Sequence, residues 1–427
     1  MTRWLAAWAC VFVTTHAWAQ TAEMAVQRLR GSAPFRTAAA FLERDYDRQF
    51  SELIALTEIP APPFKEDARG RAYLQLLEDA GLSDVERDPD GNVMGVWRGQ
   101  GAASAEGRPM LAVLAHLDTV FPEGTDVRVR RTGTRLEAPG IGDDTRALAL
   151  VLSMARALRA SRLAVHDDIL FVGNVGEEGE GDLRGVKYLL GKGRYKDRIR
   201  QLIAIDGGDQ RFVTNGAVGS LRYRVTFKGP GGHSYGAFGL VNPAFAMADA
   251  MQRFSRVTVP AAPRTTFNVG VVQGGTSVNA IPVEVSMDVD MRSESPVELK
   301  KIDAAFRQLV ADAVSAENAA RSTAQGRIAA DLRLIGDRPS GETAADTMLV
   351  QTVSAVVTAY GMTPTYEASS TDANFPISLG IPAVTIGRGG AGGRGHSLDE
   401  WTDVEKTAMV RGAEVALAIV AAAAGAP

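Results

Sequence analysis

MLAVLAHLD, residues 110–118, is the stretch that decides the fold of this chain. Its first six residues are all apolar, which is typical of a strand buried on both faces of a parallel sheet. His116 and Asp118 follow at the carboxyl end of that strand, where open α/β sheets form their binding sites. The sequence therefore predicts a buried strand that presents a histidine and a carboxylate at the edge of a sheet.

Similar apolar runs recur along the chain, and segments of helical periodicity separate them. This alternation favours a parallel sheet with helices on both faces. The further strands are expected at 169–175, 202–205 and 383–386, and the helices at 37–56, 68–80, 148–158, 345–360 and from Val404 onward.

The pattern changes near Ala217 and returns after about Pro339. The intervening order of elements is β-α-β-β-α, which fits a ferredoxin-like antiparallel sheet with two helices on one face. We expect strands at 221–228, 267–272, 283–292 and 328–334, with helices at 243–254 and 296–317. The predicted domains are one α/β domain of residues 20–216 and 339–427 and an inserted domain of residues 217–338.

The first nineteen residues have the pattern of a signal peptide: Arg3, an apolar run, and small residues at Ala17 and Ala19. This predicts export to the periplasm or the medium; the alternative is a leader that is retained. Cys10 is the only cysteine and lies in this leader, so the mature chain has no disulfide, thiol nucleophile or cysteine ligand. No other apolar stretch suggests a membrane span, and a net charge of −4 without basic runs argues against nucleic-acid binding.

Several expected strand ends carry a histidine or a carboxylate, mostly beside glycine. His166, which is followed by Asp167 and Asp168, is interpreted instead as a surface residue. Scattered surface acids would not recur in this way. Two histidines and three carboxylates are sufficient for a two-zinc site, and one further glutamate can act as a general base. The strand-end residues are His116, Glu177 with Glu178, Asp206, and His396, and the glycine-containing segment 139–144 adds Asp143 with Asp144.

Together and in this order, these motifs resemble the zinc exopeptidase and deacylase family of peptidase T, glutamate carboxypeptidase, succinyl-diaminopimelate desuccinylase, acetylornithine deacetylase and the aminoacylases. The resemblance covers nearly the whole mature chain. It implies a catalytic domain with a mixed sheet flanked by helices, and an inserted α+β ferredoxin-like domain that serves as a lid and in dimerisation.

The resemblance also implies two zinc ions per chain, with cobalt or manganese as possible substitutes. It places His116 and Asp206 on the first ion, Glu178 and His396 on the second, and Asp143 as the bridge between them. Glu177 is then the general base that activates a water bridging the two ions, and Asp118 orients His116.

In the inserted domain, Gly231-Gly232-His233-Ser234 resembles the motif whose histidine stabilises the oxyanion, in several relatives from a partner subunit. Asn279 and Arg292 resemble residues that hold the substrate's carboxylate, a task that suits arginine. Alternatively, Asn279 is a turn residue and Arg292 a solvated strand end. A homodimer through the inserted domain is a further expectation of the resemblance.

The expected activity is that of an exopeptidase that cleaves the terminal amide bond of short peptides. One alternative is an N-acyl-amino-acid amidohydrolase, that is, a deacylase. A binding protein that kept the fold and lost catalysis, and an enzyme with a single zinc ion, are the remaining alternatives.

Overall fold

The computed structural model describes residues 20–104 and 106–427, so the predicted signal peptide lies outside the described residues. The chain divides into two compact units. The first runs to Ala217 and resumes at Glu342, and the second is Val218–Gly341. The expected domain limits differ from this division by one residue at the first crossing and by three at the second.

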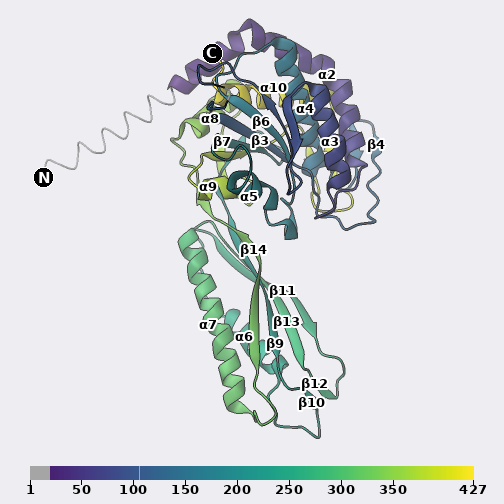
Figure 1. Ribbon diagram of the computed structural model, residues 1–427, viewed down its shortest axis with the longest axis vertical. Helices are drawn as coiled ribbons and strands as arrows, with labels where there is room; N and C mark the ends of the chain where they lie inside the picture. The colour runs from purple at the N-terminus through teal and green to yellow at the C-terminus, as the bar shows by residue number, and fades with distance from the viewer. Residues whose placement is uncertain (1–19, 105) are drawn as a thin grey trace, which may run out of the picture. The chain divides into compact units, whose positions relative to one another are not determined.

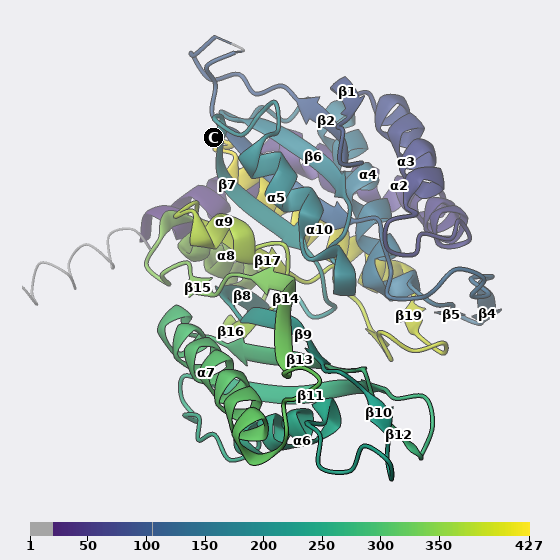
Figure 2. The ribbon, with the colours of Figure 1, turned by 60° about the horizontal axis from the view of Figure 1, so that its bottom comes forward.

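The first unit is built on a mixed sheet of strand order β1-β2-β6-β3-β7-β17-β8-β15, with β16 also paired to β8 (Figures 1 and 2). The core pairs β3–β6, β3–β7 and β17–β7 are parallel, as expected from the sequence. The β1–β2, β2–β6 and β17–β8 pairs are antiparallel, so the expected mixed sheet is confirmed. The strands are β1 (Ser83–Arg87), β2 (Val93–Trp97), β3 (Met110–His116), β6 (Asp168–Asn174), β7 (Ile199–Ile205), β8 (Phe212–Ala217), β16 (Thr365–Ser369) and β17 (Ala383–Ile386).

The first six residues of strand β3 are apolar, and both faces of the strand are covered. Leu111, Val113 and Ala115 pack in one core with helices α2, α3, α4, α8 and α10, while Met110, Ala112 and Leu114 pack in the other with α5 and α9. Each of these six side chains is almost fully buried. The helices are α2 (Ala33–Thr57), α3 (Asp67–Ala80), α4 (Arg146–Ser161), α5 (Arg184–Gly191), α8 (Met348–Ala359), α9 (Asn374–Ser378) and α10 (Lys406–Ala423).

A small antiparallel sheet of order β18-β19-β5-β4 was not expected from the sequence. Its strands have only two or three residues each, too few to show an alternating pattern. They are β4 (Arg130–Thr132), β5 (Arg135–Glu137), β18 (Gly392–Gly393) and β19 (Trp401–Asp403). Because β5 pairs with β19, this sheet brings the segment that contains His396 to the segment that leads into Asp143.

The second unit is an antiparallel sheet of order β11-β13-β9-β14 that packs against α6 and α7, which confirms the expected ferredoxin-like architecture. A short pair, β10 with β12, extends from it. The elements are β9 (Gly219–Lys228), β10 (Gly232–His233), α6 (Pro243–Phe254), β11 (Thr265–Gly274), β12 (Ala280–Ile281), β13 (Glu284–Ser293), α7 (Pro296–Ala320) and β14 (Ala329–Arg338); β15 (Gly341–Glu342) lies at the second crossing between the units.

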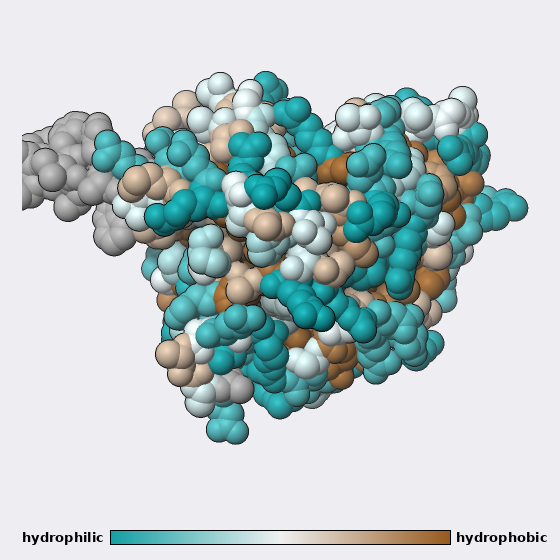
Figure 3. All heavy atoms as spheres, turned by 90° about the horizontal axis from the view of Figure 1, so that it is seen from above, coloured by the Kyte–Doolittle hydropathy of each residue, from teal (hydrophilic) through white to brown (hydrophobic). Residues whose placement is uncertain are grey.

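In the part of the chain that the structure describes, no helix combines the length and the apolar character needed to cross a bilayer. On the face seen in Figure 3, hydrophobic residues form scattered spots among hydrophilic ones. Single exposed apolar residues of this kind are normal for a folded protein surface.

Candidate metal centre

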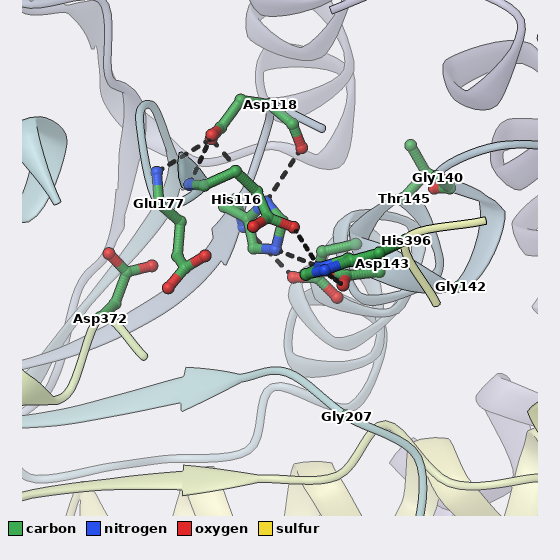
Figure 4. A network of polar contacts seen from close by, with 12 residues as sticks. His116, Asp118, Gly140, Gly142, Asp143, Thr145, Glu177, Gly207, Asp372 and His396 are labelled. Carbon is green, nitrogen blue, oxygen red and sulfur yellow. Dashed lines mark hydrogen bonds and ion pairs between the residues drawn. The ribbon is translucent and has the colours of Figure 1, made fainter. Parts of the chain in front are cut away.

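The five expected metal ligands converge in the first unit, near the carboxyl ends of the parallel strands. Figure 4 labels three of them, His116, Asp143 and His396. His116 ends β3, Glu178 and Asp206 follow β6 and β7, Asp143 lies in the turn before α4, and His396 lies between β18 and β19. Potential ligand atoms lie within 4.8 Å of one another in the set His116, Asp143 and Asp206, and again in the set Asp143, Glu178 and His396. Asp143 belongs to both sets, which is the arrangement that a bridging carboxylate requires.

The two oxygens of Asp143 face different histidines. Oδ1 lies 2.9 Å from Nε2 of His116, and Oδ2 lies 3.2 Å from Nε2 of His396. The same nitrogen of His396 is 2.9 Å from Oε1 of Glu178. Asp143 therefore directs one oxygen into each half of the centre.

The orientation of His116 differs in one respect from the expectation. Its Nδ1 lies 3.0 Å from the backbone carbonyl of Asp118, whereas the Asp118 carboxylate is 3.8 Å away. That carboxylate instead accepts the backbone N–H groups of Glu177, at 3.1 Å, and Glu178, at 2.8 Å. The main-chain carbonyl of Asp118 thus contacts Nδ1 of His116, which leaves Nε2 of the ring facing the centre. The side chain of Asp118 holds the backbone of Glu177 and Glu178.

The protonation equilibria reflect an excess of buried carboxylates. Burial, with Asp143 nearby, raises the pKa of Asp206 to about 6, and burial raises the pKa of Asp144 well above its usual range. Burial alone would lower the pKa of His116, but Asp143 and neighbouring acids hold it well above the usual value. Hydrogen bonds to Asp143 and Glu178 raise the pKa of His396 to about 10. In Asp143 burial is opposed by hydrogen bonds to both histidines, and the net effect lowers its pKa.

This set of donors fits divalent cations. Imidazole nitrogen and carboxylate oxygen are zinc ligands, and a bridging carboxylate is suited to two ions. Among the described residues, Asp144 Oδ1 and Asp372 Oδ1 are buried side-chain oxygens without a hydrogen-bond partner, and Asp144 lies beside the bridging position. Positive charge would offset the cost of burying so many acids.

Sequence reasoning missed Glu400, a buried residue that fixes the Asp143 turn. Its Oε2 accepts the N–H of Gly140 at 2.8 Å, and its Oε1 accepts those of Gly142 and Asp143, both at 2.7 Å. Burial raises the pKa of Glu400 to about 7. The only sequence signal was an acid four residues after His396, which has no pattern of its own.

Asp372 was also missed. It is buried, and Oδ2 accepts a 2.7 Å hydrogen bond from the side-chain amide of Asn174, at the end of β6. Burial raises the pKa of Asp372 to about 7. Figure 4 shows its carboxylate directed toward that of Glu177. Asp372 is thus a second buried carboxyl group that points toward the expected base.

The three expected residues of the second unit do not form one cluster within that unit. His233 and Asn279 are neighbours, because β10 pairs with β12 and the N–H of Ser234 donates to the carbonyl of Asn279 at 2.9 Å. Arg292 lies near the other end of β13, with its guanidinium on Asp290 at 2.7 Å. It lies eight positions along the strand from Glu284, a span of about 27 Å.

A family model described as "Peptidase family M20/M25/M40" matches residues 112–422. An acetylornithine deacetylase from Myxococcus xanthus is 28% identical over 349 residues, which are 78% of this chain and 82% of the relative. A probable carboxypeptidase from Aspergillus clavatus is 27% identical over 248 residues, which are 53% of this chain and 54% of the relative.

Solved structures of low sequence identity share the fold. The aminopeptidase PepT from Bacillus cereus superposes with a TM-score of 0.69 at 20% identity, covering 88% of this chain and 98% of that one. A dinuclear metal-binding peptidase of the M20 family from Bacillus subtilis gives 0.64 at 15% identity, covering 90% and 98%. With the family model matching most of its length, the chain belongs to peptidase family M20/M25/M40 and is a hydrolase of that type.

Proposed function

We propose that this hydrolase is a di-zinc exopeptidase that cleaves the terminal amide bond of short peptides. The observation that carries the proposal is the position of Asp143 between two sets of potential ligands, one with His116 and Asp206 and the other with Glu178 and His396. Peptide substrates are in keeping with the peptidases among the structures that share the fold.

In this proposal, zinc supplies Lewis-acid chemistry when bound, polarising the scissile carbonyl and making water more acidic. Glu177 takes the proton from the attacking water and later gives it to the leaving amine. Asp118 holds the backbone of Glu177, so the base is fixed before substrate binds. His233 is assigned to the oxyanion, and Asn279 with Arg292 to the substrate's carboxylate.

Because His233 lies in the β10–β12 pair, which is near the Glu284 end of β13, and Arg292 lies near the other end of β13, we assign them to the sites of two different chains of a homodimer. The edge strand β11 supports pairing between chains, since it exposes Val271 and Val272 along an open strand edge. Light scattering is expected to give twice the mass of one mature chain, and a monomer that is fully active would contradict this assignment.

A deacylase is the second candidate. It is favoured by the likeness to the Myxococcus xanthus acetylornithine deacetylase, which extends over most of both chains. The same ligands and base would serve it, because a peptide bond and an N-acyl bond are both amides. The two candidates differ only in the substrates that are accepted.

Metal quantification coupled to a substrate panel tests the proposal. We expect about two zinc ions per chain by elemental analysis, and turnover of dipeptides or tripeptides above that of N-acetyl amino acids. A higher kcat/KM on N-acetyl amino acids would establish the deacylase instead. One metal ion per chain in a fully active enzyme would contradict the two-metal site.

The contacts of Glu400 lead to a second prediction. Glu400→Gln replaces one acceptor oxygen with an NH2 group, so at least one N–H of the Asp143 turn loses its partner. Groups that position metal ligands contribute about 10–100-fold to metal affinity, and we expect a loss of that size by competition with a chelator. Excess zinc is expected to restore activity.

Glu405→Gln is the matched control, because Glu405 accepts the N–H groups of Thr407 and Ala408 at the start of α10. It should lower stability slightly without changing metal affinity. If both variants retain the wild-type affinity for zinc, Glu400 does not position the bridging carboxylate.

A further inference from the structure

A groove of about 400 Å³ lies in the first unit between the loops that carry the expected catalytic residues. Val120 and Pro122 come from the loop that begins with Asp118, and Gly179 and Glu180 directly follow the acidic pair. The third wall is the loop between α2 and α3. The groove is lined by Pro62, Pro63, Phe64, Lys65, Val120, Pro122, Glu123, Gly179 and Glu180.

We propose that this groove receives an apolar side chain of the substrate, from a residue that flanks the scissile bond. The inference rests on the proposed function and deepens it by naming a substrate class. Short peptides with a bulky aliphatic or aromatic residue at the cleavage point would be preferred over those with alanine at the same point.

The short distance between the groove and the expected catalytic residues supports the proposal. Gly179 is one residue from Glu178 and Val120 two residues from Asp118, so their Cα atoms lie within about 4–7 Å of those site residues. One residue of an extended substrate spans about 3.5 Å. A peptide whose carbonyl lies at the metal centre can therefore place a neighbouring side chain in the groove. The N–H of Thr119 donates to the carbonyl of Ala61 at 3.0 Å, which joins two of the walls.

Phe64 has the features of a side chain built for binding. It is 59% exposed, although burial would stabilise a ring of this size. Its backbone has φ of 65°, a conformation that is costly for a bulky residue and is found mainly where function requires it. The strained backbone keeps an apolar ring at the surface of the groove.

Contacts with Glu66 and Arg184 also hold the Phe64 ring in place. Glu66 is buried and accepts the N–H of Phe64 at 3.0 Å and the guanidinium of Arg184 at 2.8 Å. The guanidinium carbon of Arg184 lies 5.3 Å from the centre of the Phe64 ring. A ring fixed on one side, with its other surface exposed, loses little entropy when an apolar group packs against it.

The chemistry of the walls selects the ligand. Pro62, Pro63, Phe64, Val120 and Pro122 provide apolar surface, and the charged groups Lys65 and Glu123 pair with each other across the opening. These two charges neutralise one another, and the exposed Glu180 adds one negative charge to a lining that is otherwise mostly apolar, so the groove disfavours acidic side chains. An uncharged, apolar side chain matches this lining.

The test compares the wild type with Phe64→Ala on two dipeptide series, X-Gly and Gly-X, with X as Ala, Leu or Phe. In one of the two series, the one that places X in the groove, the wild type should have a higher kcat/KM for Leu and Phe than for Ala. Phe64→Ala should reduce that ratio about 10-fold. Phe64→Leu should keep most of it. Met24→Ala removes another exposed apolar side chain, 54% exposed, and should leave the preference unchanged.

Each outcome has a distinct meaning. If the wild type hydrolyses neither these dipeptides nor the same peptides extended by one glycine to tripeptides, the proposed function fails. If it does hydrolyse them and Phe64→Ala keeps the wild-type ratio in both series, the groove inference alone is overturned. A change in oligomeric mass with an unchanged ratio would also overturn it, because the groove would then contact a second copy of the chain.

Discussion

Glu177→Gln is expected to lower kcat by a factor of about 10²–10⁴ while the protein keeps two metal ions per chain. Glutamine has the size of glutamate and can occupy the same space, but its amide cannot take a proton from water. The backbone N–H of residue 177 still donates to Asp118, so the loop should keep its position. Elemental analysis and steady-state kinetics on the same preparation provide the measurement.

The result also distinguishes two roles for this residue. Glu177 lies with His116 and Glu178 in a third group whose potential ligand atoms are within 4.8 Å of one another, so geometry alone would allow it to bind metal. Loss of metal in Glu177→Gln would identify a ligand, and retained activity would remove its role as base. Glu177→Ala should behave like Glu177→Gln. Glu78→Gln, on the exposed face of α3, is the control for removal of one negative charge.

Much of the fold of both units could be predicted because local and global signals agree. The apolar run of β3 indicates a strand buried on both sides, and α6 has the limits expected from Pro243 and its amphipathic pattern. The site residues could be located because parallel strands place their ends at one edge of the sheet. The motifs that contain these residues also follow one another along the chain in the same order as in the zinc exopeptidase and deacylase family.

What could not be predicted depends on contacts between distant segments. Glu400 is 257 residues from Asp143, and its role is visible only once β19 pairs with β5. The side chain of Asp118 accepts backbone N–H groups from Glu177 and Glu178, and a sequence does not show which N–H groups a carboxylate will meet. The separation of His233 from Arg292 likewise follows from strand register.

Metal-stripped protein is expected to lose thermal stability as the pH rises from 5 to 9. Folding raises the pKa of Asp206 to about 6 and those of Asp372 and Glu400 to about 7, so the folded state binds more protons than the unfolded state above the ordinary carboxyl values. Their contribution to stability is complete below those ordinary values and is lost as the pH rises through 6 to 7. The raised pKa of His396, about 10, extends the loss toward alkaline pH.

The lowered pKa of Asp143 acts in the opposite direction only in acid, below the ordinary aspartate value, and so does not affect this pH range. Scanning calorimetry after dialysis against a chelator should show Tm falling, by about 2–4 °C for each kcal/mol of stability lost. A Tm that is constant or rises between pH 5 and 9 would contradict the protonation assignments made for the metal-free centre.

Adding zinc should reverse this dependence, since metal binds the deprotonated ligands and binds only the folded state. Zinc at about 1,000 times its dissociation constant stabilises the folded state by about 4 kcal/mol. Because more of the ligands are deprotonated at pH 8 than at pH 5.5, the increase in Tm on adding zinc should be larger at pH 8. Asp143→Asn removes the carboxylate shared by both ligand sets and is the matched control. If that variant gains as much from zinc as the wild type, the metal binds elsewhere, because a centre bridged by Asp143 cannot retain two ions once the bridge is gone.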